Sequence, residues 1–110
     1  MGRNKKLPLT ETVYYILLAL LKPAHGYIIM QTVEDLSDGE VRMAAGTLYG
    51  AIENLLKLKY IKQVESEDAR RKVYLITDQG KDMLVQQYKR YKHMIEITDV
   101  CLRGDIDEKI

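Results

Sequence analysis

Apolar side chains recur every three or four residues near the start of the chain, which is the period of a helix. The stripe consists of Val13, Ile16, Leu17, Leu20 and Leu21, and it is widened by Tyr14, Tyr15 and Leu18. We therefore expect this helix to be covered on more than one side. Either Thr10 or Thr12 can cap its free amides, and Pro23 stops it.

A second helical segment runs from His25 to Ser37, where the pair Asp38-Gly39 is a strong turn signal. Val41 and Met43 then predict a short extended piece. A third helix comes next. Thr47 is a suitable cap for it, although Ala45 or Gly46 can also be its boundary.

The third helix has two contrasting faces. Its apolar stripe comprises Leu48, Ile52, Leu55 and Leu56. The opposite face is small and polar and comprises Thr47, Gly50, Asn54 and Lys57, with Tyr49 and Glu53 on its flanks. This face is either an ordinary exposed helix surface or a surface that closely approaches a partner, and the missing bulk favours the partner. Asn54 or Lys57 can reach a base or a phosphate, whereas Tyr49 can equally be half-buried.

From Tyr60 the period changes to two, which indicates strands. A first strand at residues 60–64 is joined by a polar connection to a second strand from Arg71 to Thr77, so we expect a β-hairpin. Three cations, Arg70, Arg71 and Lys72, precede the alternating part of the second strand. They either protect an edge strand from aggregation or bind phosphate, and the neighbouring polar helix face favours phosphate.

A last helix is predicted from Asp78, with Thr77 or Asp78 as its cap, to about Leu102, ending near Gly104. Side chains spaced four and three residues apart form a heptad seam of Leu84, Tyr88, Tyr91, Ile95, Thr98 and Leu102, thickened by Met94, Ile97 and Cys101. The seam can pack on the first helix, on the same helix of a second subunit, or on both. Its width favours a second subunit in an antiparallel or crossed contact.

Three helices, a hairpin and a final helix describe a winged helix-turn-helix, so the fold class is mainly α with a small β-hairpin. We expect one domain, with residues 8–78 as the DNA-binding part, 79–103 as a dimerisation helix and 104–110 as a flexible tail. In such a fold the third helix enters the major groove and the hairpin, or wing, lies over the backbone. Two-fold symmetry then places two recognition helices about 34 Å apart on a pseudo-palindromic operator.

The net charge of +1 favours no polyanion by itself, but the charge is unevenly distributed. Between residues 41 and 64 four cations stand against the single acid Glu53, a local charge of +3. Acids gather instead at 34–40 and 105–108. One basic face can therefore bind a polyanion despite the nearly neutral total.

Several other classes of protein are disfavoured. No apolar run approaches the roughly 20 residues of a membrane span, and the basic start of the chain lacks a signal-peptide pattern. The single cysteine, Cys101, is consistent with a reducing cytoplasm. His25 and His93 have no further ligands at metal-site spacing, no Gly-rich phosphate loop or nucleophile triad stands out, and we expect no enzyme, metal or cofactor.

The stretches HGYIIMQTVED, GTLYGAIENLLKLKYI and ARRKVYLITDQGK resemble the PadR family of transcriptional regulators, over roughly residues 10–100. In its short length the chain resembles the small subfamily, in which one C-terminal helix replaces a longer helical dimerisation domain. The resemblance implies a homodimeric, ligand-responsive regulator, usually a repressor, in which Tyr49 and Arg70 to Lys72 touch the DNA backbone. It also places Tyr91 at an aromatic position in a pore between subunits. Two departures are Lys59, where the family often has Gly, and the absence of Trp.

We therefore expect a sequence-specific DNA-binding regulator. The hypothesis gives the DNA contacts to Thr47, Tyr49, Asn54, Lys57, Arg70, Arg71 and Lys72. Tyr88, Tyr91 and Met94 are either ordinary packing residues or part of a subunit-interface pocket for a planar apolar, aromatic or cationic effector. The alternatives are a winged-helix module that binds an acidic protein and a small-molecule-binding protein without DNA affinity.

Overall fold

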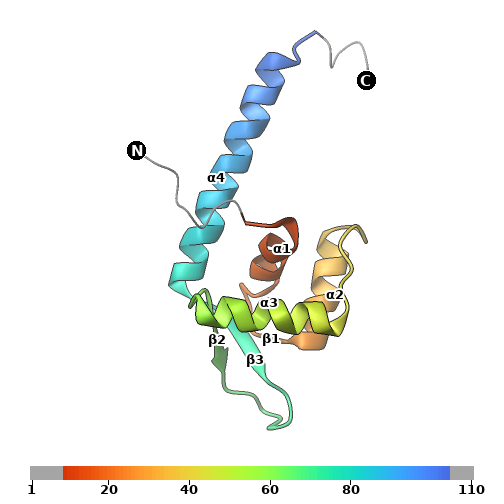
Figure 1. The fold of residues 1–110 in the computed structure, drawn as a ribbon, viewed down its shortest axis with the longest axis vertical. Coiled ribbons are helices and arrows are strands. Elements are labelled where there is room, and N and C mark those ends of the chain that lie inside the picture. The colour runs from red at the N-terminus through yellow and green to blue at the C-terminus, as the bar shows by residue number, and fades with distance from the viewer. Residues whose placement is uncertain (1–8, 105–110) are drawn as a thin grey trace.

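The computed structural model describes residues 9–104, which form four helices and a three-stranded sheet. The elements are α1 (Glu11–Ala19), β1 (Ala24–His25), α2 (Gly26–Leu36), α3 (Ala45–Lys57), β2 (Ile61–Val64), β3 (Val73–Ile76) and α4 (Asp78–Cys101). In Figure 1 the helix α4 extends from the body as a rod, and the hairpin of β2 and β3 leaves at the opposite end. The predicted tail at 105–110 lies outside the described residues.

The first helix begins at one of its two predicted caps. Of the two candidate caps, Thr10 is the one used, because its Oγ1 accepts a hydrogen bond from the Val13 amide at 3.1 Å. The helix ends at Ala19, before Pro23. Ile16, Leu17 and Leu20 are fully buried and form the centre of the core.

The sheet has one strand more than the predicted hairpin. Ala24 and His25 form β1, which pairs antiparallel with β3, opposite Tyr74 and Val73 respectively. On its other edge β3 pairs with β2, from Ile61 opposite Ile76 to Val64 opposite Val73, so the strand order is β1-β3-β2. A strand of two residues is too short to show a period of two, and its existence depends on a partner distant in sequence.

The segment between α2 and α3 contains the predicted turn. Asp38 and Gly39 make the predicted turn, with φ of 53° and 80°. The extended piece at 41–43 is not part of any strand. Val41 is instead buried, and its amide donates to the hydroxyl of the buried Ser37 at 2.9 Å. Side-chain capping of the turn thus replaces strand pairing for this segment.

Of the three candidate starts of the third helix, Ala45 is the one observed, and Thr47 is not its cap. Ala44 is the cap residue and makes no side-chain hydrogen bond. The Leu48 amide already donates to the Ala44 carbonyl at 3.1 Å, which places Thr47 inside the first turn. The apolar stripe is confirmed, since Leu48, Ile52 and Leu55 are buried.

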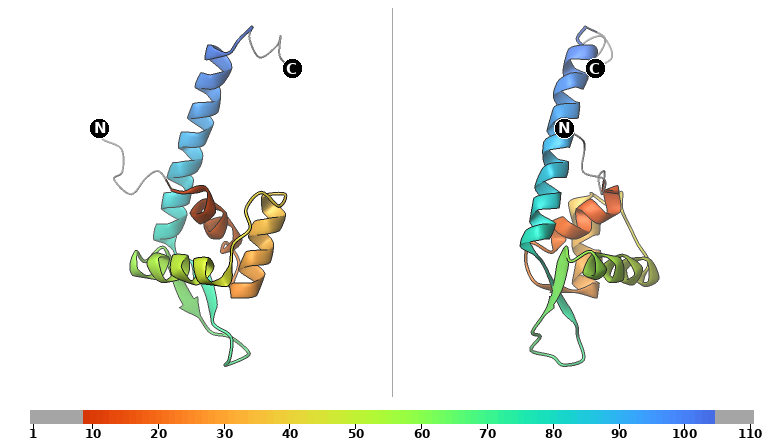
Figure 2. Two further views of the ribbon diagram at one scale, coloured as in Figure 1. Left: turned by 45° about the vertical axis from the view of Figure 1, so that its right-hand side comes forward. Right: turned by 60° about the vertical axis from the view of Figure 1, so that its left-hand side comes forward.

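The fourth helix has a buried base and an exposed rod. Thr77 caps it by accepting from the Gly80 amide at 3.0 Å. Met83 and Leu84 belong to the core, and the buried Gln87 accepts a hydrogen bond from the Leu9 amide at 2.9 Å. Both views in Figure 2 show the C-terminal part of α4 extending beyond the other elements. No helix within residues 9–104 has the length and apolar character to cross a membrane.

Candidate nucleic-acid interface

The polar face of α3 is open to solvent. Thr47, Gly50, Asn54 and Lys57, here called the recognition face, are all exposed. A Cβ built on Gly50 meets nothing within 4 Å among the described residues. Lys57 lies 3.7 Å from Glu53 one helical turn earlier, and both side chains are well exposed. The face therefore presents small polar groups and one cation that a partner can approach.

Tyr49 lies beside this face and also contacts α2. Half of its surface is exposed, as the sequence allowed. Its hydroxyl lies so close to Gly26 that a Cβ at position 26 would overlap it. Nearby, burial raises the pKa of Tyr74, and the proximity of Tyr49 raises it further. Glycine at the first residue of α2 thus makes room for the tyrosine ring.

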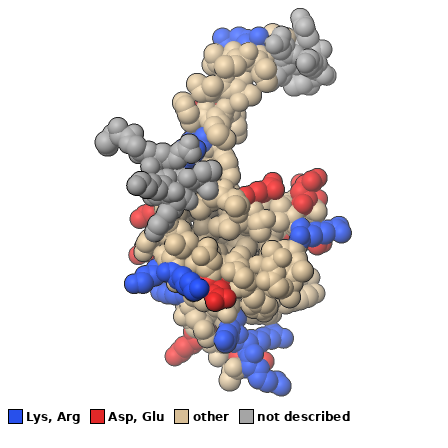
Figure 3. All heavy atoms as spheres, in the orientation of Figure 1, with Lys and Arg blue, Asp and Glu red and all other residues tan. Residues whose placement is uncertain are grey.

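The three cations of the wing, the hairpin of β2 and β3, are exposed at its tip. Arg70, Arg71 and Lys72 all precede β3. Two of them are paired with one acid: Arg70 Nε lies 3.4 Å from Asp68 Oδ1, and Arg71 Nε lies 3.9 Å from Asp68 Oδ2. Figure 3 shows Lys and Arg side chains gathered over the wing and at the end of α3. Asp68 was not singled out from the sequence, although its short separation from the arginines was visible there.

The predicted seam on α4 is divided between core and surface. Leu84 is buried in the core of its own subunit, which fits the packing alternative. Tyr91 is half-buried and makes an edge-to-face contact with Tyr14 of α1, with ring centroids 5.1 Å apart. The other apolar or small seam positions are exposed: Tyr88, Met94, Ile95, Thr98 and Leu102. An isolated subunit therefore leaves an apolar strip on α4 in water.

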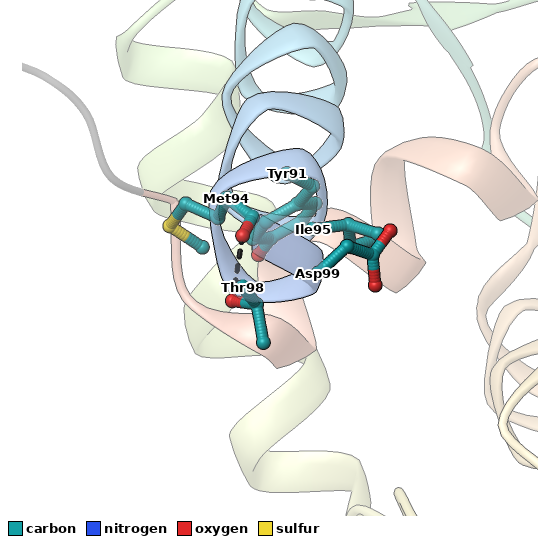
Figure 4. A pocket seen from close by; sticks show the side chains of 5 residues that line it. All are labelled: Tyr91, Met94, Ile95, Thr98 and Asp99. Atoms are coloured by element: carbon teal, nitrogen blue, oxygen red, sulfur yellow. Dashed lines mark hydrogen bonds between the residues drawn. The ribbon is translucent and has the colours of Figure 1, made fainter. Parts of the chain in front are cut away.

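The upper part of this strip is hollowed. Tyr91, Met94, Ile95, Thr98 and Asp99 line a space of about 470 Å³, here called the α4 hollow. All five residues come from one helix, so the hollow is an open surface feature (Figure 4). The Thr98 hydroxyl donates its hydrogen bond to the Met94 carbonyl oxygen within the helix, at 2.7 Å.

The next features are the possible metal ligands and the single cysteine. Within residues 9–104 no three His, Cys, Asp or Glu side chains gather in a way that could hold a metal ion. Cys101 is exposed as a free thiol near the end of α4.

Comparison with known proteins identifies the family. The model of the PadR-like transcriptional regulator family matches residues 16–86, which include α2, α3 and the wing. The chain belongs to the PadR family. It is thus a DNA-binding transcriptional regulator, and the members of this family are regulators, not enzymes.

Individual proteins are also similar to this chain in sequence or in fold. The chain is 30% identical over 90 residues to the uncharacterized protein X of Lysinibacillus sphaericus, covering 79% of this chain and 83% of the relative. A transcriptional regulator from Clostridium thermocellum superposes with a TM-score of 0.67 at 29% identity, covering 79% of this chain and 86% of the other. A PadR family regulator from Eggerthella lenta matches with a TM-score of 0.67 at 24% identity, covering 83% and 80%.

Proposed function

We propose that this PadR protein is a homodimeric, ligand-responsive, sequence-specific repressor that acts in the cytoplasm. Residues 8–78 form the DNA-binding part and residues 79–103 the dimerisation helix. The observation that carries the proposal is the open recognition face of α3 next to the cationic tip of the wing. Both lie at the end of the molecule away from the free end of α4 (Figures 1 and 2).

In the proposed complex α3 enters the major groove. Thr47, Asn54 and Lys57 face base edges or phosphates, and Tyr49 contacts the backbone. The wing arginines and Lys72 bind phosphates of the flanking DNA, where such contacts supply most of the sequence-independent affinity. The mixed polar composition of the recognition face suits direct readout of bases.

Dimerisation uses the exposed strip of α4. Ile95 is 62% exposed and Leu102 39%, so a second copy would remove substantial apolar surface from water. A two-fold axis through paired α4 helices presents two recognition faces to a pseudo-palindromic operator, about one helical turn or 34 Å apart. The homodimer is thus part of the DNA-binding mechanism.

The α4 hollow is the proposed effector site, completed by the second subunit. Tyr91 and Met94 offer a polarisable apolar lining, and the ring of Tyr14 contacts Tyr91. Such a lining suits a planar apolar, aromatic or cationic molecule. A ligand that prefers one separation of the subunits changes DNA affinity by its differential binding to the two arrangements.

The wing contact is tested by the double variant Arg70→Ala/Arg71→Ala. Its affinity for a DNA duplex is measured between about 50 and 200 mM salt. We expect weaker binding to all sequences and a log–log salt slope that is shallower by roughly 0.9 for each phosphate that the variant no longer binds. An unchanged slope rejects the phosphate role.

Sequence specificity is tested by a band shift with the DNA upstream of the protein's own gene and a scrambled duplex of the same length. Preference for the upstream DNA supports the regulator. Equal affinity for both, or no binding, favours a winged-helix module for an acidic protein partner.

A further inference from the structure

Asp68 organises the tip of the wing through its backbone and its carboxylate. Its Oδ1 accepts a hydrogen bond from the Arg70 amide at 2.9 Å, and its carbonyl accepts from the Arg71 amide at 2.9 Å. Ser66 closes the turn from the other side, with its hydroxyl 2.8 Å from the Asp68 carbonyl. The residue is half-buried, whereas the arginines it contacts are exposed.

The same carboxylate is shared by two guanidinium groups. One oxygen lies 3.4 Å from Arg70 Nε and the other 3.9 Å from Arg71 Nε. Each exposed pair is worth only about 0–1 kcal/mol, because water screens it and the side chains lose freedom. The pairing is therefore weak enough for a phosphate to displace, yet it must be broken or weakened in the process.

The charge of the wing tip makes this competition relevant. Residues 65–72 contain three cations, Arg70, Arg71 and Lys72, and three acids, Glu65, Glu67 and Asp68, so the segment has no net charge. Among the described acids, Asp68 is the one paired with the wing arginines. The carboxylate of Asp68 thus partly neutralises the positive charge of Arg70 and Arg71 at the proposed phosphate contact.

We propose that Asp68 competes with DNA phosphate for Arg70 and Arg71 and so lowers the affinity of the wing for DNA of any sequence. The proposal rests on the proposed wing–phosphate contact. A duplex that also satisfies the recognition face of α3 overcomes the competition, whereas a random duplex has only its phosphates to offer. Because this penalty is the same for every sequence, Asp68 keeps non-specific binding weak by setting the overall affinity, and it leaves the ratio of specific to non-specific binding unchanged.

The variant Asp68→Asn separates the charge from the turn. The amide oxygen of Asn can still accept from the Arg70 amide, so the shape of the tip is retained, but the negative charge is gone. Glu67→Gln is the matched control, because Glu67 is the exposed neighbouring acid and forms no ion pair with the described residues. Thermal unfolding of each variant verifies that the fold is intact.

The test measures binding to a random-sequence duplex of about three helical turns by fluorescence anisotropy at several salt concentrations. We expect Asp68→Asn to bind about three- to tenfold more tightly near 50 mM salt, clearly more than Glu67→Gln. The gain should shrink as salt increases, because screening weakens all exposed charge interactions. Equal gains in the two variants, or no gain in Asp68→Asn, overturn the competition.

The double variant Arg70→Ala/Arg71→Ala distinguishes this failure from failure of the proposed function. If the double variant binds as tightly as the original protein, the wing–phosphate contact itself is wrong. If it binds more weakly while Asp68→Asn shows no gain, only the competition is wrong. Added to the double variant, Asp68→Asn should give a much smaller gain, because the partners it releases are absent.

Discussion

The hydroxyl of Thr77 donates a hydrogen bond to the carbonyl oxygen of Lys59 at 2.7 Å. Thr77 caps the start of α4, and Lys59 follows the end of α3 in a left-handed conformation with φ of 64°. Next to this bond the Thr77 amide donates to the Tyr60 carbonyl at 2.9 Å. Gly80 packs against the same carbonyl, where a Cβ would overlap it. The proposed dimerisation helix and the proposed recognition helix are thus joined at one junction.

Replacing Thr77 tests this junction. Thr77→Val keeps the shape but removes both the cap of α4 and the bond to Lys59, so we expect the free energy of unfolding to fall by about 1–3 kcal/mol. Thr77→Ser retains the hydroxyl and should lose much less. Urea unfolding measures both, and equal losses in the two variants would show that the hydroxyl is not what holds the junction.

The tyrosine cluster between α1 and α4 predicts a dependence of stability on pH. Burial raises the pKa of Tyr14 above its ordinary 10.0, and Tyr91 and Tyr88 raise it further. Because the folded state disfavours the phenolate, this contribution to stability is complete below pH 10.0 and is lost as the pH rises through the raised pKa.

Tyr14→Phe cannot ionise but retains the ring that contacts Tyr91. We expect the variant to lose less stability than the original protein when thermal unfolding is compared below and above pH 10.0. Identical alkaline losses would place the titrating group elsewhere.

The helices and the hairpin could be predicted from the sequence because their signals are local. The apolar stripe on α3 lies opposite a polar face. Thr10 and Thr77 cap the starts of α1 and α4. Lys59 adopts a left-handed conformation at a position where the family that the sequence resembles often has Gly. These features depend on residues within a few positions of one another.

The remaining features depend on distant contacts. The strand at Ala24 exists only because β3 lies beside it. Leu84 is buried in the core of its own subunit, whereas later positions of the seam on α4 are exposed. The start of α3 at Ala45 could not be distinguished from a start at Gly46 or Thr47, because Ala44 makes no side-chain capping hydrogen bond. The sequence shows that Asp68 is close to the two arginines along the chain. That one carboxylate pairs with both guanidinium groups could be seen only from the side-chain geometry.

The recognition face predicts that added bulk harms binding and not folding. Gly50→Leu should raise the free energy of unfolding by about 0.5–1 kcal/mol, because Gly is a poor helix former and its surroundings are open. DNA affinity should fall by at least about tenfold if α3 enters a groove. Gln86→Leu, an exposed position on α4, is the control and should bind normally. Unchanged affinity in Gly50→Leu would remove this face from the interface.

The strip on α4 predicts a dimer that one charge can break. Ile95→Asp should give monomers in sedimentation velocity and lose DNA binding, because it buries a carboxylate in an apolar contact. Val100→Asp is the control, since Val100 is 60% exposed against 62% for Ile95 and lies about 140° away around the helix. A dimer that survives Ile95→Asp, or is lost equally in both, would contradict the predicted seam.

The most direct test of the account is the distance between the two recognition helices in the assembled protein. A spin label at Asn54→Cys, in a chain that also carries Cys101→Ser, reports this distance by pulsed electron resonance in the DNA-free protein, where the label on the recognition face obstructs no DNA. Two copies joined through α4, with recognition faces spaced to fit successive major grooves, should give a separation near 34 Å. No dipolar coupling between labels, or a separation that cannot match one turn of DNA, would contradict the account.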